Sequence, residues 1–289
     1  MSAATVAAEL GQAKREGRQW RCLCPLHGGR SLLLRDGREG RLLVSCMAGC
    51  DSLDVLKELR RLQIDGFAEY TPRKDERAGR IERQQLIARR IWQAGTPGER
   101  SPQIKRYLVA RGITLPPPPA LRWAARVWHS TTRRSGLQYP AMIGKIVDVD
   151  DELVALHKTY LRPDGAGKIA GIQAKEFLGP VTGAAVRLAA ADPDRPLIIG
   201  EGIESTLSVM QLRGWPGWAA LSAPGMRALQ LPANVRLVLI AVDNDRNGVG
   251  QDAAREAAWR WQQEGRAVRV ALPPDGQDFN DVLRRGAME

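Results

Sequence analysis

Short apolar runs and segments with helical spacing alternate along the last third of the chain. The apolar runs lie in RPLIIGEG (195–202), GWAALSA (217–223), VRLVLIAVDND (235–245) and AVRVALPP (267–274). Helix-like segments follow the first, third and fourth runs: IESTLSVMQLRG, GVGQDAAREAAWRWQQEG and GQDFNDVLRRG. This alternation is typical of a parallel sheet with helices on its faces. We therefore expect an α/β domain over residues 193–289.

The middle of the chain, residues 81–192, predicts a mixed α+β subdomain. Two segments have helical spacing, RIERQQLIARRIWQAG (80–95) and SPQIKRYLVARGI (101–113), and prolines end the second one. Strand-like runs follow in LRWAARVWHS, YPAMIGKIVDVDDELVALHKTYL, EFLGP and AVRLAA. Within the second of these runs, DVDDE is interpreted as a solvated hairpin turn.

The first 69 residues predict a small separate domain. SLLLRD (31–36) and RLLVS (41–45) are expected to form a hairpin around the turn GREG. DSLDVLKELRRLQI then has helical spacing, with Asp51 or Ser52 as its N-cap. The charged segment YTPRKDERAGR (70–80) lacks periodicity and is expected to be a linker.

All four cysteines fall within this first domain. Cys22 and Cys24 lie in CLCPLHGG together with His27, and Cys46 and Cys50 lie in CMAGC. Two short-spaced pairs on either side of a hairpin predict a zinc ribbon with a tetrahedral Zn²⁺ site. The preferred ligands are Cys24, His27, Cys46 and Cys50, and the alternative is that Cys22 replaces one of them. A disulfide is disfavoured because no signal-peptide pattern is present, and a cytoplasmic location is expected.

The net charge of +11 is unevenly distributed. Residues 193–289 carry 11 Lys and Arg against 12 Asp and Glu, whereas residues 1–192 carry 32 against 20. The basic excess therefore lies outside the predicted α/β domain. It favours a polyanion-binding part joined to a carboxylate-bearing part, although solubilising charge is the simpler alternative. We expect no contact with a membrane, because no run of about 18 apolar residues occurs.

Carboxylates follow three of the predicted parallel strands. Glu201 follows the first strand, Asp243 and Asp245 the third, and Asp278 and Asp281 the fourth. Because the carboxyl ends of parallel strands meet at one edge, these acids are expected to converge. Two like charges near 4 Å repel by roughly 4 kcal/mol at an effective dielectric near 20. A bound Mg²⁺ or Mn²⁺ would offset that repulsion. For the Asp243 and Asp245 pair alone, helix capping by Asp245 is the alternative.

Taken in order, EGIES, DNDRNGVGQDAA and GQDFND resemble the motifs of the Toprim domain, which DnaG-type primases, topoisomerases and some nucleases share. Upstream, CPLH and CMAGC resemble the zinc-binding domain of bacterial and phage primases. KRYLVARGI resembles a segment near the start of the primase catalytic core. The order of these parts is similar to that of primases, most of all to the Toprim primases of phages, plasmids and integrated elements.

The chain departs from this family at three places. Cys46 and Cys50 are separated by three residues, where two are usual. Ser205 stands where Toprim primases commonly have an aspartate. A third motif with two aspartates one residue apart is replaced by Asp278, Asn280 and Asp281. The resemblance therefore supports a first metal site more strongly than it supports additional metal sites.

The resemblance implies a DNA primase that builds short primers on single-stranded DNA from nucleoside triphosphates. Asp243 and Asp245 would hold the catalytic metal, and Glu201 would act as general acid/base or as a further ligand. Asp278 and Asp281 are additional candidate ligands for Mg²⁺. No P-loop motif is present, so a replicative helicase is expected to be a separate polypeptide.

Three basic residues are predicted to contact nucleic-acid or nucleotide phosphates because they flank predicted strands: Lys158, Arg162 and Lys175. His157 alternates with apolar neighbours and is expected to be structural. Trp20, Trp123 and Trp128 are expected mostly in the core, with base stacking as the alternative. Two other functions stay open: a Toprim nuclease, and a DNA-binding accessory protein of weak activity.

Overall fold

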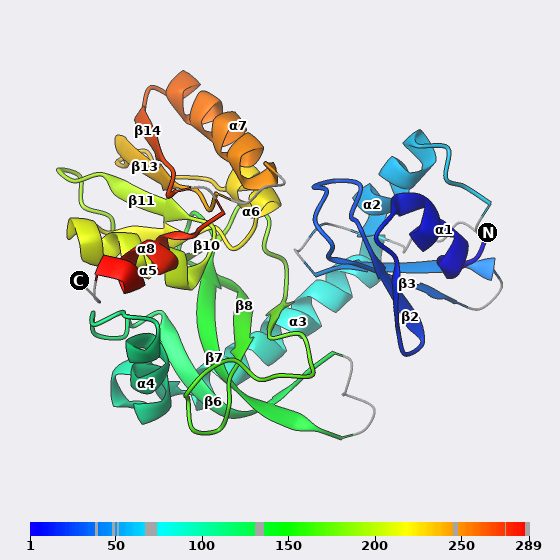
Figure 1. Cartoon of the computed structure of the whole chain (residues 1–289), viewed down its shortest axis with the longest axis horizontal. Coiled ribbons are helices and arrows are strands. Elements are labelled where there is room, and N and C mark those ends of the chain that lie inside the picture. Colours follow the sequence, from blue (N-terminus) through cyan, green and yellow to red (C-terminus); the bar gives the residue numbers. More distant parts are fainter. Residues whose placement is uncertain are drawn as a thin grey trace. The chain divides into compact units, whose positions relative to one another are not determined.

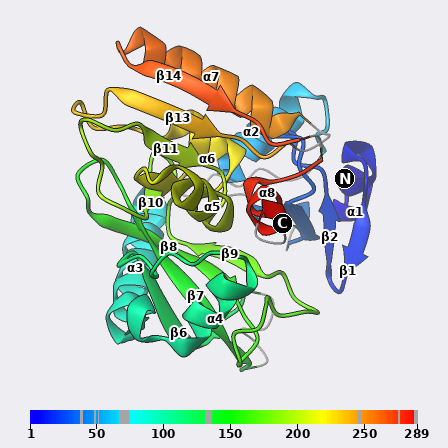
Figure 2. The same ribbon diagram turned by 60° about the vertical axis from the view of Figure 1, so that its left-hand side comes forward.

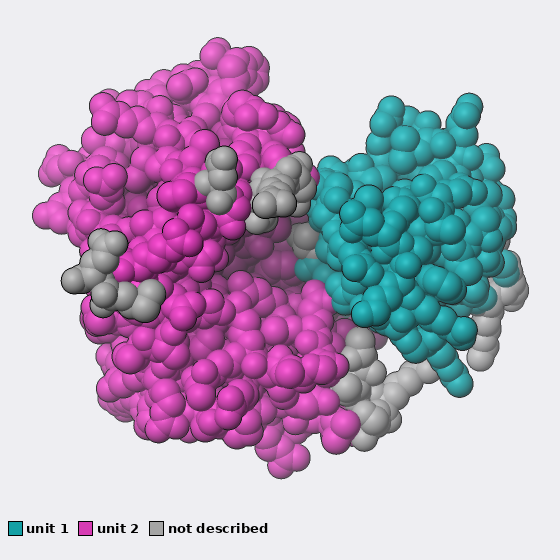
Figure 3. Space-filling model, viewed as in Figure 1, with its two compact units in different colours: residues 1–80 teal, residues 81–289 magenta. Residues whose placement is uncertain are grey.

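The computed structural model describes residues 1–37, 40–47, 50, 52–66, 74–130, 136–244, 248–274 and 276–286. The chain forms two compact units, residues 1–80 and residues 81–289 (Figure 1, Figure 3). Within the described ranges, no helix has both the length and the apolar character that crossing a bilayer requires.

The first unit is built on an antiparallel sheet of four strands in the order β1-β2-β3-β4. Its elements are α1 (Ala3–Leu10), β1 (Lys14–Glu16), β2 (Gln19–Cys22), β3 (Leu32–Asp36), β4 (Leu42–Cys46) and α2 (Ser52–Arg61). The predicted hairpin is present as β3 and β4, with Leu34 paired opposite Val44. Three elements, α1, β1 and β2, were not predicted from the sequence. Both of these strands are short and carry charged residues, so they lack the apolar alternation that marks a strand.

The second unit begins with helices and continues into antiparallel strands. Its first elements are α3 (Lys74–Ala94), β5 (Thr96–Pro97), the 3-10 helix η2 (Gly98–Arg100), α4 (Pro102–Ala110), β6 (Leu121–Trp128), β7 (Gln138–Val147), β8 (Leu153–Tyr160), β9 (Lys175–Leu178) and β10 (Ala185–Arg187). The strand runs agree with those predicted. α3 starts earlier than predicted, so residues 74–80 of the expected linker are helical. Residues 70–73 lie outside the described residues.

The remaining elements form the predicted parallel sheet. They are β11 (Leu197–Gly200), α5 (Ile203–Arg213), β12 (Gly217–Ala219), α6 (Ala223–Ala228), β13 (Leu237–Ala241), α7 (Val249–Gln263), β14 (Ala267–Ala271) and α8 (Phe279–Gly286). The strand order is β14-β13-β11-β12, and the three pairings are all parallel. Figure 2 shows α7 lying along β14, with α5 beside α8. Ile198 belongs to the core that includes α5, and its neighbour Ile199 to the core that includes α7. Both faces of β11 are therefore buried, which explains its continuous apolar run.

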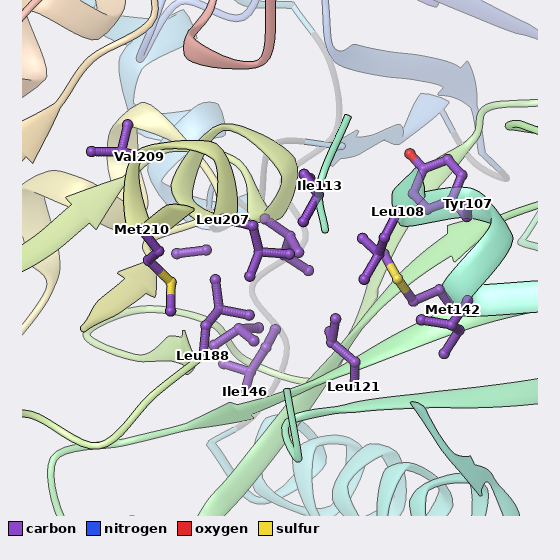
Figure 4. Close-up of a cluster of buried hydrophobic side chains, with 14 of the residues drawn as sticks. Tyr107, Leu108, Ile113, Leu121, Met142, Ile146, Leu188, Leu207, Val209 and Met210 are labelled. Carbon is purple, nitrogen blue, oxygen red and sulfur yellow. The ribbon is translucent and has the colours of Figure 1, made fainter. Parts of the chain in front are cut away.

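Strand β7 connects the two sheet regions of the second unit. Along one edge it pairs first with β6 and then, at Ile146 and Val147, with β10, which in turn pairs with β12. The core follows the same path: one cluster includes Tyr107 and Leu108 of α4, Met142 of β7 and Leu207 of α5 (Figure 4). The antiparallel and parallel parts thus share one sheet and one hydrophobic core.

Candidate functional site

The carboxyl ends of β11 and β13 lie in register at one edge of the sheet. Gly200 of β11 pairs with Ala241 of β13, and Ala241 pairs with Ala271 of β14. Glu201 is the first residue after β11, and Asp243 is the second after β13. Strand pairing therefore brings the segments of these two acids to the same edge, as predicted from the sequence.

The glycine at the second position of α7 leaves room for the Glu201 carboxylate. A Cβ atom built on Gly250 would lie 3.2 Å from Oε2 of Glu201 and 3.6 Å from the backbone oxygen of Asp243. The Glu201 carboxylate thus lies beside the first turn of α7, where the helix dipole favours negative charge. A side chain at position 250 would occupy the space between Glu201 and the Asp243 loop.

The loop after β13 is tied to the loop after β14. The Asn244 backbone N–H donates to the Gln277 oxygen at 3.0 Å, and its side-chain amide donates to the Pro273 oxygen at 2.9 Å. Gln251 of α7 donates to the Asn244 side-chain oxygen at 3.0 Å. Asn244 therefore fixes the segment that leads to Asp278 against the segment that carries Asp243.

Asp278 and Asp281 form a reciprocal capping box at the start of α8. The Asp281 N–H donates to Asp278 Oδ1 at 2.8 Å, and the Asp278 N–H donates to Asp281 Oδ2 at 3.3 Å. Asn280 between them is buried, and its amide donates to the Arg111 oxygen and to Oγ of Ser208. Asn280 attaches α8 to α5 and to the end of α4, so its amide has a packing role where the family pattern has an acid.

Asp245 lies outside the described residues. Among the described ones, the acids Glu201, Asp243, Asp278 and Asp281 do not form a group of three ligand atoms within metal-binding distance. Ser205, at the position of the family's usual aspartate, is buried in α5.

Next to Glu201 along the chain, Glu204 is the centre of a charged cluster that was not predicted from the sequence. Its carboxylate accepts a hydrogen bond from Tyr107 Oη at 2.6 Å, and Lys168 Nζ and Lys175 Nζ each lie 3.1 Å away. Burial alone would raise the pKa of Glu204, but Lys175, Lys168 and the Tyr107 hydroxyl hold it well below its usual range. The one sequence signal for this cluster was the position of Glu204 at the start of an expected helix. Its partners Tyr107, Lys168 and Lys175 are distant in sequence and gave no local signal.

The three predicted phosphate-binding residues have different surroundings. Lys175 is 39% exposed at its side chain and pairs with Glu204, and Arg162 is 58% exposed and pairs with Asp164. Lys158 is buried, and its ammonium contacts Glu176 at 2.8 Å, Tyr160 Oη at 2.9 Å and the Trp128 oxygen at 3.2 Å. Burial and these partners correct the prediction for Lys158, whose charge is used inside the protein.

The aromatic candidates also separate. His157 is buried, as expected for a structural residue; burial and then Lys175 lower its pKa to about 3, so it is neutral. Trp123 belongs to the core and Trp20 packs against one, whereas Trp128 is exposed.

In the first unit, the four preferred zinc ligands come together. Ligand atoms of Cys24, His27, Cys46 and Cys50 all lie within 4.8 Å of one another. Cys24 and His27 lie in a tight turn after β2, closed by the Gly28 N–H that donates to the Cys24 oxygen, and Cys46 ends β4. Three sulfurs and one imidazole are a donor set that fits tetrahedral Zn²⁺.

Cys22 lies outside this group. Its Sγ is 3.8 Å from the Leu32 oxygen in the hydrophobic core, and burial raises its pKa to about 12. A thiol that lies in the core, apart from the sulfurs of Cys24, Cys46 and Cys50, is not placed to share an ion with them.

Several solved structures share features with this chain. A DNA primase domain from Pseudomonas aeruginosa is 17% identical, with 70% of this chain and 74% of that chain covered and a TM-score of 0.47. The zinc-binding and RNA polymerase domains of the Aquifex aeolicus primase are 15% identical, with 99% and 80% covered and a TM-score of 0.45. A DnaG primase catalytic domain bound to single-stranded DNA is 16% identical, with 72% and 78% covered and a TM-score of 0.46.

Two protein families match the second unit. Residues 82–188 match a domain of unknown function (DUF7146), and residues 196–289 match the Toprim domain. No curated protein matches the chain. The parallel sheet, the acids that follow β11 and β13, and this match agree with one another: residues 196–289 form a Toprim domain.

Proposed function

We propose that the protein is a DNA primase that joins nucleoside triphosphates into short primers on a single-stranded DNA template. The observation that carries the proposal is the convergence of the Glu201 and Asp243 segments at the carboxyl edge of a Toprim domain. A Cys₃His cluster in the first unit and the basic excess of residues 1–192 support it.

Glu201, Asp243 and Asp245 would hold Mg²⁺ or Mn²⁺, because carboxylate oxygens are the donors these cations prefer and Gly250 places no Cβ against Oε2 of Glu201. When bound, the cation would supply positive charge to the phosphate oxygens. Glu201 would accept or donate a proton, or serve as a further ligand. Asp278 and Asp281 each use one oxygen in the capping box, which leaves the other oxygen of each for a second cation.

The remaining residues would bind phosphates and hold the zinc. Cys24, His27, Cys46 and Cys50 would bind structural Zn²⁺. Arg162, whose side chain is mostly exposed, and Lys175, whose side chain is partly exposed, would contact phosphate groups of nucleic acid or nucleotide. Backbone contacts would dominate template binding, so binding would weaken steeply with salt. A replicative helicase would act as a separate chain, and replication of a mobile element is the setting that the sequence resemblance favours.

Incubation of the protein with single-stranded DNA, ribonucleotides and Mg²⁺ tests the proposal. We expect new oligonucleotides that form only when the DNA template, ribonucleotides and Mg²⁺ are all present. Shortened DNA would indicate a Toprim nuclease, which uses the same acids to cleave. Neither product, with DNA binding retained, would indicate an accessory protein.

A further inference from the structure

The carboxylate of Glu204 joins α4 to the stretch around the start of β9, two segments that are far from each other in the sequence. Tyr107 comes from α4, Lys168 from the loop before β9, and Lys175 from the start of β9. The loop that carries Lys168 packs tightly on α4: a Cβ on Gly165 would lie only 2.4 Å from the Gln103 oxygen. Glu204 itself lies in the first turn of α5, where the helix dipole favours a carboxylate. The positions of both ammonium groups therefore depend on this one side chain.

The cluster carries more positive than negative charge, and its lysine side chains are more exposed than its carboxylate. The side chain of Glu204 is 7% exposed, whereas those of Lys168 and Lys175 are 28% and 39% exposed. Two ammonium groups share the Glu204 carboxylate, so these three side chains together carry a net positive charge, and Asp243 and Arg111 are further charges that act on Lys175. Each ammonium has three N–H donors, and the ion pair with Glu204 uses one of them. The lysine pair can therefore bind an anion while both ammonium groups keep their contacts with Glu204.

The lysine pair lies beside the acidic edge of the sheet. Glu204 follows Glu201 by three residues across the same strand-to-helix turn, and a Cβ on Gly202 would lie 3.8 Å from Oε2 of Glu204. Asp243 is among the charges that act on Lys175. An anion on the lysines would thus lie next to the acids that the proposed function assigns to catalysis. In a primase, the phosphate chain of an incoming nucleotide would have to lie next to these acids, because its reacting phosphate must reach them.

We propose that Glu204 is a positioning residue that holds Lys168 and Lys175 as a paired site for the phosphate chain of a nucleoside triphosphate. This inference rests on the proposed function for the identity of the ligand. It assigns the lysine pair to the nucleotide and leaves template contacts to other basic residues.

The test measures binding of a non-hydrolysable nucleoside triphosphate with Mg²⁺ by calorimetry, and binding of single-stranded DNA by fluorescence anisotropy, on the full chain. Lys168→Met, Lys175→Met and Glu204→Gln should each weaken triphosphate binding about tenfold or more, since a hydrogen bond to a charged group typically has that effect. DNA affinity should change by less than about threefold. In primer extension, KM for the nucleotide should rise more than kcat falls. Glu204→Asp, which keeps the charge, should lie between wild type and Glu204→Gln.

Matched controls are Lys105→Met, an exposed lysine on α4 outside the cluster, and Glu256→Gln, an exposed glutamate on α7 that pairs with Arg227. Both should leave triphosphate affinity unchanged. If Glu204 only neutralised two lysines, Glu204→Gln would leave triphosphate binding unchanged or tighten it, and that result in a folded variant would overturn the proposal. Weaker DNA binding with normal triphosphate binding in the lysine variants would overturn it as well. If Glu204→Gln does not fold, the two lysine variants decide.

The two proposals fail in different ways. A wild-type chain that binds triphosphate through these lysines but makes no primer would contradict the primase proposal alone. A chain that makes primers with normal nucleotide KM in all cluster variants would contradict the lysine-pair site together with the role of Glu204, and would leave the primase proposal intact.

Discussion

Lys158 and Glu176 are directly opposite each other on β8 and β9, and their charged groups lie 2.8 Å apart inside the protein. Their side chains are 7% and 3% exposed. Ser130 and Tyr160 also donate to the Glu176 carboxylate, and His129 lies 3.3 Å from it. The pair is thus embedded in a polar network, and removing one partner would leave the other charge buried and uncompensated.

Lys158→Met should therefore destabilise the second unit by about 3–5 kcal/mol, because a buried carboxylate loses its counter-ion. Urea unfolding measures the free-energy difference. The double variant Lys158→Met/Glu176→Gln should recover part of the loss, since no lone charge remains. A cost below about 1 kcal/mol for the single variant, similar to a surface salt bridge, would contradict the buried pairing.

Asp243→Ala should abolish primer synthesis and leave template binding and thermal stability close to those of wild type. The reason is that Asp243 lies on the acidic edge, outside the basic part of the chain. Asp245→Ala is expected to behave in the same way. Product formation and DNA anisotropy are measured on the same samples, with Asp252→Ala, on the exposed first turn of α7, as the control. Near-normal synthesis in Asp243→Ala would remove the metal assignment.

Metal analysis of the purified protein should find one zinc per chain. Cys46→Ser and Cys50→Ser should lose it, and Cys22→Ser should keep it, because Cys22 lies in the core apart from the cluster. His27→Ala should lose zinc or bind it more weakly. Zinc loss in Cys22→Ser together with retention in His27→Ala would show that the ligand set is wrong.

Acid should destabilise the second unit through His157. Its pKa is lowered to about 3 from the usual 6.5, by burial first and then by Lys175, so the unfolded chain takes up a proton that the folded chain refuses. Stability is complete above pH 6.5 and falls as the pH drops toward 3, by about 1.4 kcal/mol per unit. Between pH 6.5 and 4.5, the loss of stability due to His157 is roughly 2 kcal/mol.

Urea unfolding at pH 7.0, 5.5 and 4.5 measures this effect. In His157→Gln, the difference between the highest and lowest pH should shrink by about that amount. His129, whose pKa burial also lowers, is present in both proteins and does not affect the comparison. An equal pH dependence in both proteins would exclude a neutral, buried His157.

Arg162→Ala should weaken binding of single-stranded DNA and reduce its salt dependence. Removal of one phosphate-binding side chain lowers the log–log salt slope by about 0.7 for a single strand. Affinity at several salt concentrations gives the slope. Arg255→Ala, an exposed arginine of α7 in the segment without basic excess, is the control and should leave the slope unchanged. An unchanged slope in Arg162→Ala would place the template on other basic residues.

The elements of the second unit were predictable because their signals are local. The apolar run Leu197–Gly200 marks a strand buried on both faces, and the order of strands and helices implies the parallel sheet. The cluster of Cys24, His27, Cys46 and Cys50 was predictable for a similar reason, since these residues form two pairs that are closely spaced in the sequence.

The partners of charged residues were not predictable, because they are set by contacts between distant segments. Lys158 was predicted to contact phosphates because it flanks a predicted strand, and the Glu176 with which it pairs inside the protein comes from β9, 18 residues further along the chain. Asn280 looked like a weakened acidic motif, but it contacts Arg111 and Ser208, which lie 169 and 72 residues away. The role of Glu204 likewise depends on its contacts with Tyr107, Lys168 and Lys175.

The pairing of β10 with both β7 and β12 has a practical consequence for dissecting the protein. The two family matches, residues 82–188 and 196–289, suggest two independent modules, yet β10 belongs to the first match and completes the sheet of the second. A fragment that contains only residues 196–289 would lose β10 and leave the edge of β12 bare, with Trp218 and Ala219 lacking their strand neighbour. Such an edge is a template for intermolecular pairing. A fragment made to study the Toprim domain should therefore include β10 together with its partner β7.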